Sequence, residues 1–82
     1  MLITGNQLKA ARALAGVDQL AVAQAAKVAV NTIRNMESRG PNPITSGAVT
    51  VRNVQIALEN LGVEFLNGEQ PGVRLRRAPH GA

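Results

Sequence analysis

Residues 16–40 read GVDQLAVAQAAKVAVNTIRNMESRG, and this stretch predicts two short helices joined by a tight turn. The first helix is expected over about Gln19–Ala26, with Asp18 placed to accept a capping hydrogen bond at its start. The second helix is expected over about Val30–Ser38, after a turn at 27–29. The apolar positions at helical spacing in the two helices are Leu20, Val22, Ala23, Ala26, Ile33 and Met36.

A further helix is predicted on the N-terminal side, over about Gly5–Ala15. Thr4 followed by Gln7 has the form of a capping box, in which each residue satisfies a backbone N–H of the other. Ile3 before the cap and Leu8 after it are spaced as a hydrophobic staple. The apolar face of this helix is expected to consist of Leu8, Ala11, Leu14 and Ala15.

On the C-terminal side the sequence predicts one more helix and then a change to strand periodicity. The helix is expected over about Gly47–Leu61, capped by Thr45 or Ser46. Its apolar stripe is expected to contain Val51, Val54, Leu58 and Leu61. Beyond Gly62, Val63–Leu66 and Val73–Arg76 alternate as strands do, with a turn signal at Asn67–Gly68.

Composition and charge narrow the class of function. The 82 residues allow one domain, and nine Lys and Arg against five Asp and Glu give a net charge of +4. Such an excess favours a polyanionic partner, although the same charge also serves solubility. Single-strand binders rely on stacking aromatic rings, and Phe65 is the only aromatic residue, so a general RNA or single-strand binder is disfavoured.

Other classes lack the residues that they need. The chain has no cysteine, and its one histidine, His80, lies near the C-terminus. A glycine-rich phosphate loop and metal-ligand spacing are also missing from the sequence, so we expect no enzyme, no cofactor and no metal site. The sequence has neither a secretory signal nor an apolar run long enough for a membrane span, so a cytoplasmic location is expected.

Residues 16–40 resemble the xenobiotic-response-element (XRE) family of regulators, which includes the phage Cro and repressor proteins. The resemblance extends over about Ile3–Leu61 and rests on Gln19, Ala23, Ile33 and the apolar–acidic pair Met36–Glu37. Two positions depart from the family pattern: Lys27 stands where the turn usually has Gly, and Ala29 where a Ser or Thr cap is usual.

The resemblance implies a mainly α fold. The expected architecture is a four-helix repressor-like helix-turn-helix DNA-binding domain over 1–62, with a short C-terminal β-hairpin or strand pair over 63–77 and a flexible tail over 78–82. The resemblance also implies that Arg12 and Glu37 form a structural ion pair between helices.

The second helix of such a motif enters the major groove with its N-terminal residues facing the bases. Asn31 or Asn35 can bond adenine bidentately, and Arg34 can bond guanine or grip a phosphate. Val30 either packs against a thymine methyl or belongs to the core. Arg34 and Asn35 either contact the bases or form a solvated surface. The predicted DNA-binding residues are Gln19, Ala29, Val30, Asn31, Thr32, Arg34, Asn35, Arg39 and Asn42, with Gln19 on the phosphate backbone.

The C-terminal strands are assigned to dimerisation. An inverted-repeat operator needs two recognition helices about 34 Å apart, so a homodimer is expected. The residues assigned to the subunit contact are Val63, Phe65, Leu66, Val73 and Leu75. The strands pair either within one chain or between two. Arg74, Arg76 and Arg77 are either a phosphate clamp or the outward face of a strand protected from aggregation.

The sequence therefore predicts sequence-specific binding of double-stranded DNA by a dimeric transcriptional regulator, a repressor in preference to an activator. The alternative is a protein-interaction module on the same fold, which binds another regulator or a toxin. The two differ in salt dependence, because DNA binding releases counterions and a mostly apolar protein contact does not.

Overall fold

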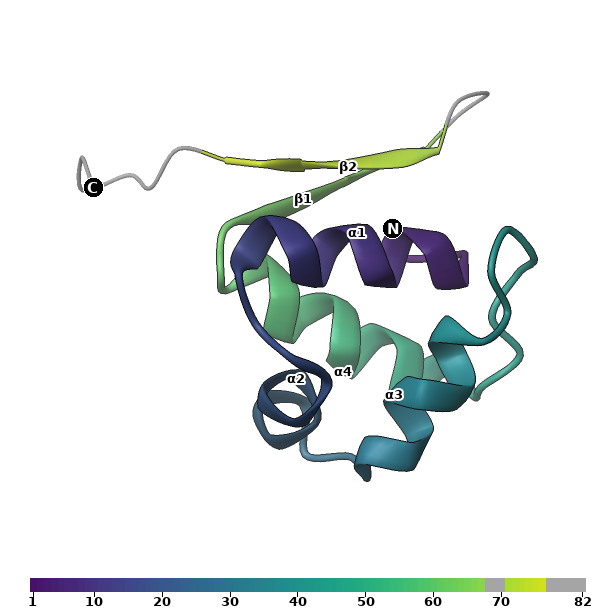
Figure 1. The fold of residues 1–82 in the computed structure, drawn as a ribbon. Coiled ribbons are helices and arrows are strands. Elements are labelled where there is room, and N and C mark those ends of the chain that lie inside the picture. The colour runs from purple at the N-terminus through teal and green to yellow at the C-terminus, as the bar shows by residue number, and fades with distance from the viewer. Residues whose placement is uncertain (68–70, 77–82) are drawn as a thin grey trace.

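The computed structural model describes residues 1–67 and 71–76 and contains four helices followed by a two-stranded antiparallel sheet (Figure 1). The elements are α1 (Gly5–Ala15), α2 (Gln19–Ala26), α3 (Val30–Glu37), α4 (Ala48–Glu59), β1 (Val63–Leu66) and β2 (Gly72–Leu75). The sheet lies along one side of α1, and α2 and α3 lie on the other side of the molecule. The fold is thus mainly α, as predicted, and within the described part no helix has the length and apolar content needed to cross a bilayer.

The start of α1 is fixed by the predicted capping box. Thr4 Oγ1 accepts from the Gln7 backbone N–H at 3.1 Å, and Gln7 Oε1 accepts from the Thr4 backbone N–H at 3.0 Å. The same Gln7 side chain donates through Nε2 to the carbonyl oxygens of Leu66 and Gly72, each at 3.3 Å. Gln7 therefore caps α1 and also ties both strands to it.

The core is aliphatic apart from Phe65 and draws on all four helices and β1. The buried apolar residues are Leu2, Leu8, Ala11, Val22, Ala23, Ala26, Ile33, Met36, Val54, Ala57, Leu58, Val63 and Phe65. Burial of such side chains stabilises the fold by roughly 25 cal/mol for each Å² of apolar surface removed from water.

Several predicted core positions lie at the surface instead. Leu14 in the last turn of α1, Leu20 in the first turn of α2 and Ile3 before the capping box are all exposed. Leu61 is exposed because α4 ends at Glu59 and the chain then turns through Gly62, which has φ 95°. Helical spacing selects a face correctly, but it does not say how far along each short helix the core extends.

Two helix ends also differ from the prediction. α4 begins at Ala48 with Gly47 at the N-cap position and no side-chain capping bond, so neither Thr45 nor Ser46 caps it. α3 ends at Glu37, and Ser38 is its C-cap.

β1 and β2 pair within the chain, in the register Val63↔Leu75 to Leu66↔Gly72. On the outer face Arg74 forms an ion pair with Glu64, its partner in that register. The pairing in the structure is thus the first of the two alternatives that the sequence left open, within one chain. Gly68 of the predicted turn, Arg77 and the tail at 78–82 with His80 lie outside the described residues.

The five residues assigned to the subunit contact differ in their exposure. Val63 is 0% exposed and Phe65 is 9% exposed within the single chain, because both point from β1 onto the helices. These side chains are covered within the single chain, and their part in a subunit contact stays a prediction. Leu66 and Val73 are half-buried and Leu75 is 48% exposed, so a subunit contact through these three stays a prediction.

Gly5 is a point of close approach that the sequence analysis did not identify. A Cβ at this position would lie 2.6 Å from Met36 O and 2.8 Å from Glu37 O, both backbone atoms at the end of α3. We predict that Gly5→Ala lowers the free energy of unfolding by about 3 kcal/mol, because α1 and α3 are forced apart.

The measurement is urea unfolding followed by circular dichroism. Gly72→Ala is the matched control, since a Cβ there meets nothing within 4 Å; its effect is expected to stay within about 0.5 kcal/mol. Equal stabilities of the two variants would contradict the close approach.

Candidate functional site

The turn between α2 and α3 sets the position of α3. Asp18 Oδ1 caps α2 by accepting from the Ala21 backbone N–H at 2.8 Å. Lys27 ends α2 in the left-handed region at φ 58°, and the Val28 N–H returns to Ala23 O at 3.0 Å. Ala29 then precedes α3 in an extended conformation with no side-chain capping bond.

One face of α3 is a row of exposed polar side chains. Asn31, Arg34, Asn35 and Ser38 are exposed and follow one another at the spacing that places residues on one side of a helix. Ile33 and the other inward residues bury the opposite face. The row contains no carboxylate, so it offers hydrogen bonds and positive charge without repelling an anion.

Specific contacts order this row. Arg34 Nη1 donates to Asn31 Oδ1 at 3.0 Å. The Ser38 hydroxyl donates to the backbone oxygen of Asn35 at 2.6 Å. Arg39, just beyond the helix, donates from Nε to Pro43 O at 3.0 Å, which holds its guanidinium beside the loop that follows α3.

The predicted DNA-binding residues divide into two groups. The exposed group lies on α3, its N-cap and the loop after it, and consists of Ala29, Asn31, Arg34, Asn35, Arg39 and Asn42. The half-buried group consists of Gln19, Val30 and Thr32. Val30 packs against the core, so the core interpretation of this residue fits the structure better than a thymine contact does.

A buried ion pair joins α1 to the end of α3, the helix that carries the row. Arg12 donates from Nη2 to Glu37 Oε1 at 2.9 Å and from Nε to Glu37 Oε2 at 2.5 Å. Its third donor, Nη1, reaches the carbonyl oxygen of Val17 at 3.2 Å. The Glu37 side chain is only 4% exposed. Hydrogen bonding to Glu37 raises the pKa of Arg12, so the guanidinium stays charged.

Gln19 belongs to this network. Its Nε2 donates to Glu37 Oε1 at 3.1 Å, so the carboxylate of α3 binds α1 through Arg12 and α2 through Gln19. The sequence analysis placed Gln19 at the phosphate backbone and missed this inward bond. The only signal in the sequence was the pairing of Arg12 with Glu37, because a carboxylate that is buried needs further donors.

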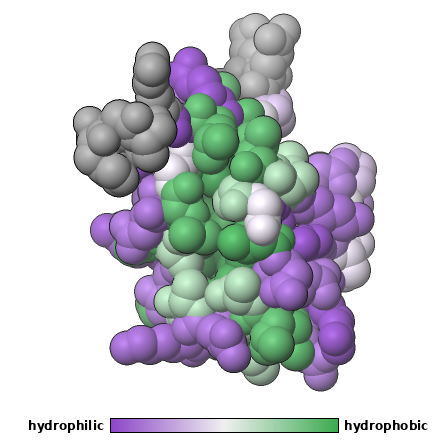
Figure 2. Space-filling view, turned by 60° about the vertical axis from the view of Figure 1, so that its left-hand side comes forward, coloured by the Kyte–Doolittle hydropathy of each residue, from purple (hydrophilic) through white to green (hydrophobic). Residues whose placement is uncertain are grey.

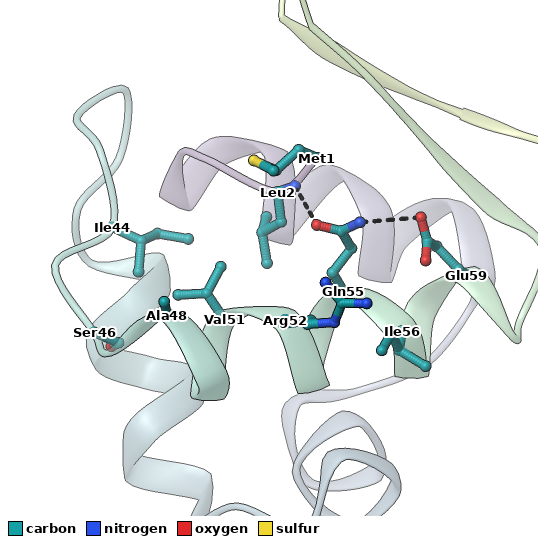
Figure 3. Close-up of a pocket in the computed structure, with 10 residues that line it drawn as sticks. All are labelled: Met1, Leu2, Ile44, Ser46, Ala48, Val51, Arg52, Gln55, Ile56 and Glu59. Atoms are coloured by element: carbon teal, nitrogen blue, oxygen red, sulfur yellow. Dashed lines mark hydrogen bonds between the residues drawn. The ribbon is translucent and has the colours of Figure 1, made fainter.

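A hollow of ≈ 490 Å³ lies between the N-terminal segment and α4 (Figure 3). Its apolar part includes Leu2, Val51 and Ile56. At its rim Gln55 Oε1 accepts from the Leu2 N–H at 2.9 Å, and Gln55 Nε2 donates to Glu59 Oε2 at 3.2 Å. Among the described residues no buried side-chain nitrogen or oxygen lacks a partner, so no unsatisfied group marks a ligand here.

Comparison with known proteins gave no match to a family model and no matching curated protein.

We predict that Arg12→Met destabilises the fold by about 3 kcal/mol or more, because the Glu37 carboxylate remains buried without its cation. The double variant Arg12→Met/Glu37→Leu is expected to recover much of that loss, since no charge is then left uncompensated. Urea unfolding measures both.

Lys9→Met is the control for this pair, because Lys9 is an exposed cation on the same helix; a change within about 0.5 kcal/mol is expected there. A double variant no more stable than Arg12→Met would show that the buried charge is not the source of the cost.

The turn yields a second prediction. Lys27 is the one non-glycine residue with positive φ among the described residues. A side chain in this region costs about 1 kcal/mol, so Lys27→Gly is expected to raise the melting temperature by a few degrees. Ala25→Gly, at an exposed position inside α2, should lower the melting temperature, because glycine inside a helix costs about 1 kcal/mol of stability. A lower melting temperature for Lys27→Gly would contradict the strain assigned to this turn.

Proposed function

We propose that this chain is a sequence-specific double-stranded DNA-binding regulator of the XRE kind. In this proposal α2 and α3 form a repressor-like helix-turn-helix, and α3 is the recognition helix. The observation that carries the proposal is the row of Asn31, Arg34 and Asn35, exposed on one face of α3 without an intervening carboxylate.

The chemistry of this row suits the major groove. A helix fits that groove, where each base pair displays its own arrangement of donors and acceptors. Asparagine and arginine are the side chains that match those edges. Arg39 lies beyond the C-terminal end of α3 with its guanidinium held at Pro43, a position suited to a phosphate.

The buried ion pair also favours an anionic partner. Glu37 is the one acidic residue of α3, and its charge is compensated by Arg12 and turned inward. The surface of α3 is thus left with Arg34 as its only charge. Together with the net charge of +4, this supports attraction to the DNA backbone.

A homodimer on an inverted-repeat operator is part of the proposal. The exposed leucines Leu14, Leu61 and Leu75 stand at the ends of α1, α4 and β2, which meet on one side of the molecule (Figure 1). With this side brought forward, Figure 2 shows a continuous apolar area. Exposed apolar surface of this kind marks protein contacts.

The same area favours a second candidate function. A protein-interaction module that binds another regulator or a toxin would use the apolar surface with Leu14, Leu61 and Leu75 and would not need the polar row of α3. Such binding would respond weakly to salt, whereas DNA binding weakens steeply as counterions compete.

The test is selection of bound sequences from a random duplex pool at low and moderate salt. We expect an inverted repeat with half-sites about 34 Å apart. Arg39→Ala is expected to weaken binding evenly across sequences and to reduce the salt slope by about 1.

Arg52→Ala is the control, because Arg52 lines the hollow beside α4 and not the row on α3. This substitution should leave the affinity for DNA and the salt slope unchanged. Recovery of unrelated sequences that are released by salt would remove DNA recognition from the proposal and leave the protein-interaction function.

A further inference from the structure

Within the described part of the chain, β2 has a neighbouring strand on one side only, because the sheet consists of β1 and β2. The register shows which backbone groups of β2 face away from β1. The Arg76 N–H donates to Gly62 O at 2.6 Å, so Arg76 and, two residues before it, Arg74 point their backbone groups toward β1. The N–H and C=O groups of Val73 and Leu75 alternate with these and therefore face the open side of β2.

This open edge is unoccupied and has a hollow beside it. Among the residues that the structure describes, no loop, helix or side chain forms a hydrogen bond with the backbone of Val73 or Leu75. A hollow of ≈ 330 Å³ is lined by Gly72 and Val73 together with Asn6 and Ala10 of α1. No described residue of β1 lines it, so it lies on the open side of β2. Free main-chain groups beside a hollow are the features that an added strand uses.

The two faces of β2 differ in chemistry. Val73 and Leu75 lie on the face that β1 turns to the helices. Val73 packs against the core, whereas Leu75 is 48% exposed. Arg74 and Arg76 are exposed and alternate with them, so they belong to the outer face. A strand added to this edge therefore has apolar neighbours on its inner face and cations on its outer face.

The surroundings of the edge carry an excess of positive charge. Arg74 is paired with Glu64 of β1. Arg76 donates from Nη2 to the backbone oxygen of Glu59 at 3.2 Å, and no carboxylate of the described part forms an ion pair with it. The helix α1, which borders the hollow, has no acidic residue and exposes Lys9. Carboxylates on an added strand would thus meet cations across the sheet, an arrangement that is stabilising.

A second copy of β2 fits this edge poorly. Two-fold antiparallel pairing places the outward-facing residues of the two strands opposite one another. A pair centred on Arg74 or on Leu75 sets Arg74 against Arg74 or Arg76 of the other copy, and like charges in that position destabilise a sheet. A pair centred on Val73 sets Leu75 against Pro71, which has no N–H to donate.

We propose that the open edge of β2 binds an extended segment of another protein in which acidic and apolar residues alternate. The segment adds a third strand by pairing with the backbone of Val73 and Leu75. Its apolar side chains lie on the side of the hollow and α1, and its carboxylates face Arg74 and Arg76. This inference concerns the backbone edge of β2 and rests neither on DNA binding nor on the homodimer proposed above.

The probe is a short peptide of alternating glutamate and valine with blocked ends, and its matched control has lysine in place of each glutamate. NMR titration of the full chain measures the affinity, and hydrogen exchange identifies the amides that the peptide protects. The glutamate peptide is expected to bind and to protect the Val73 and Leu75 amides. The lysine peptide is expected to bind at least about tenfold more weakly, because it sets cations against Arg74 and Arg76.

Leu75→Pro tests the backbone pairing. It removes the outward N–H and leaves the bonds to β1, because proline is tolerated on an edge strand where its nitrogen faces away from the ladder. Leu75→Ala is the matched control, since it shortens the same side chain and keeps the N–H. The glutamate peptide is expected to bind Leu75→Pro at least about tenfold more weakly than Leu75→Ala. If Leu75→Pro does not fold, the protection of the two amides in the wild type decides the question.

Equal affinity of the two variants would overturn the inference, because the contact would then not use the edge. Equal affinity of the two peptides, or binding that leaves the Val73 and Leu75 amides unprotected, would overturn it as well. Protection of these amides that grows with protein concentration in the absence of peptide would show that a second copy occupies the edge, which also contradicts the inference. If the glutamate peptide does not bind while a DNA sequence is selected, the inference fails alone and the proposed function stands.

Discussion

The carboxylate of Glu37 is the constraint on which the rest of the structure depends. It is buried at the end of α3, so it must be paired and hydrogen-bonded. Its partners are Arg12 from α1 and Gln19 from α2. One anion therefore fixes the two preceding helices relative to α3. The orientation of α3 is thus set by several hydrogen-bond donors at once.

Close packing reinforces the same junction. Gly5 lets the start of α1 touch the backbone at the end of α3, where any side chain would clash. The Asn6 N–H donates to Gly40 O at 2.8 Å, which joins α1 to the loop after α3. The end of α3 is thus held by an ion pair, a backbone contact and a hydrogen bond, while its exposed row has no such ties to α1.

Much of the fold could be predicted because its signals are local. The capping box of Thr4 and Gln7 and the cap at Asp18 each act within a few residues, and α1 and α2 have the predicted bounds. The start of α4 depends on a distant contact instead. The Ile44 N–H donates to Ile3 O at 2.7 Å, which holds the chain there beside the segment before α1. Spacing alone could not show that Gly47 would be the N-cap.

The candidate site shows the same division. The common face of Asn31, Arg34 and Asn35 follows from helical spacing, whereas the inward turn of Gln19 requires the assembled helices. A polar residue at a helix start is typical of a surface position, and the bond to the buried carboxylate turns the half-buried Gln19 inward. Likewise, alternation in β1 predicted a two-faced strand but not what covers it. Val63 and Phe65 are covered by their own chain.

Burial of one strand face also limits how two copies of the chain can meet. Val63 and Phe65 are inside, whereas Leu75 at the end of β2 is 48% exposed and Leu14 and Leu61 are exposed at the ends of α1 and α4; these three leucines form the rim. The ends of α1, α4 and β2 that carry the rim lie on one side of the molecule, and α3 lies on another. A second copy could therefore bind at the rim without covering the row. Arg12 of α1 is paired with Glu37 of α3, and Leu14 of the rim also belongs to α1. The helix α1 therefore connects the rim to α3. In a two-fold pair built this way, the packing of α1 would set the separation of the two α3 helices.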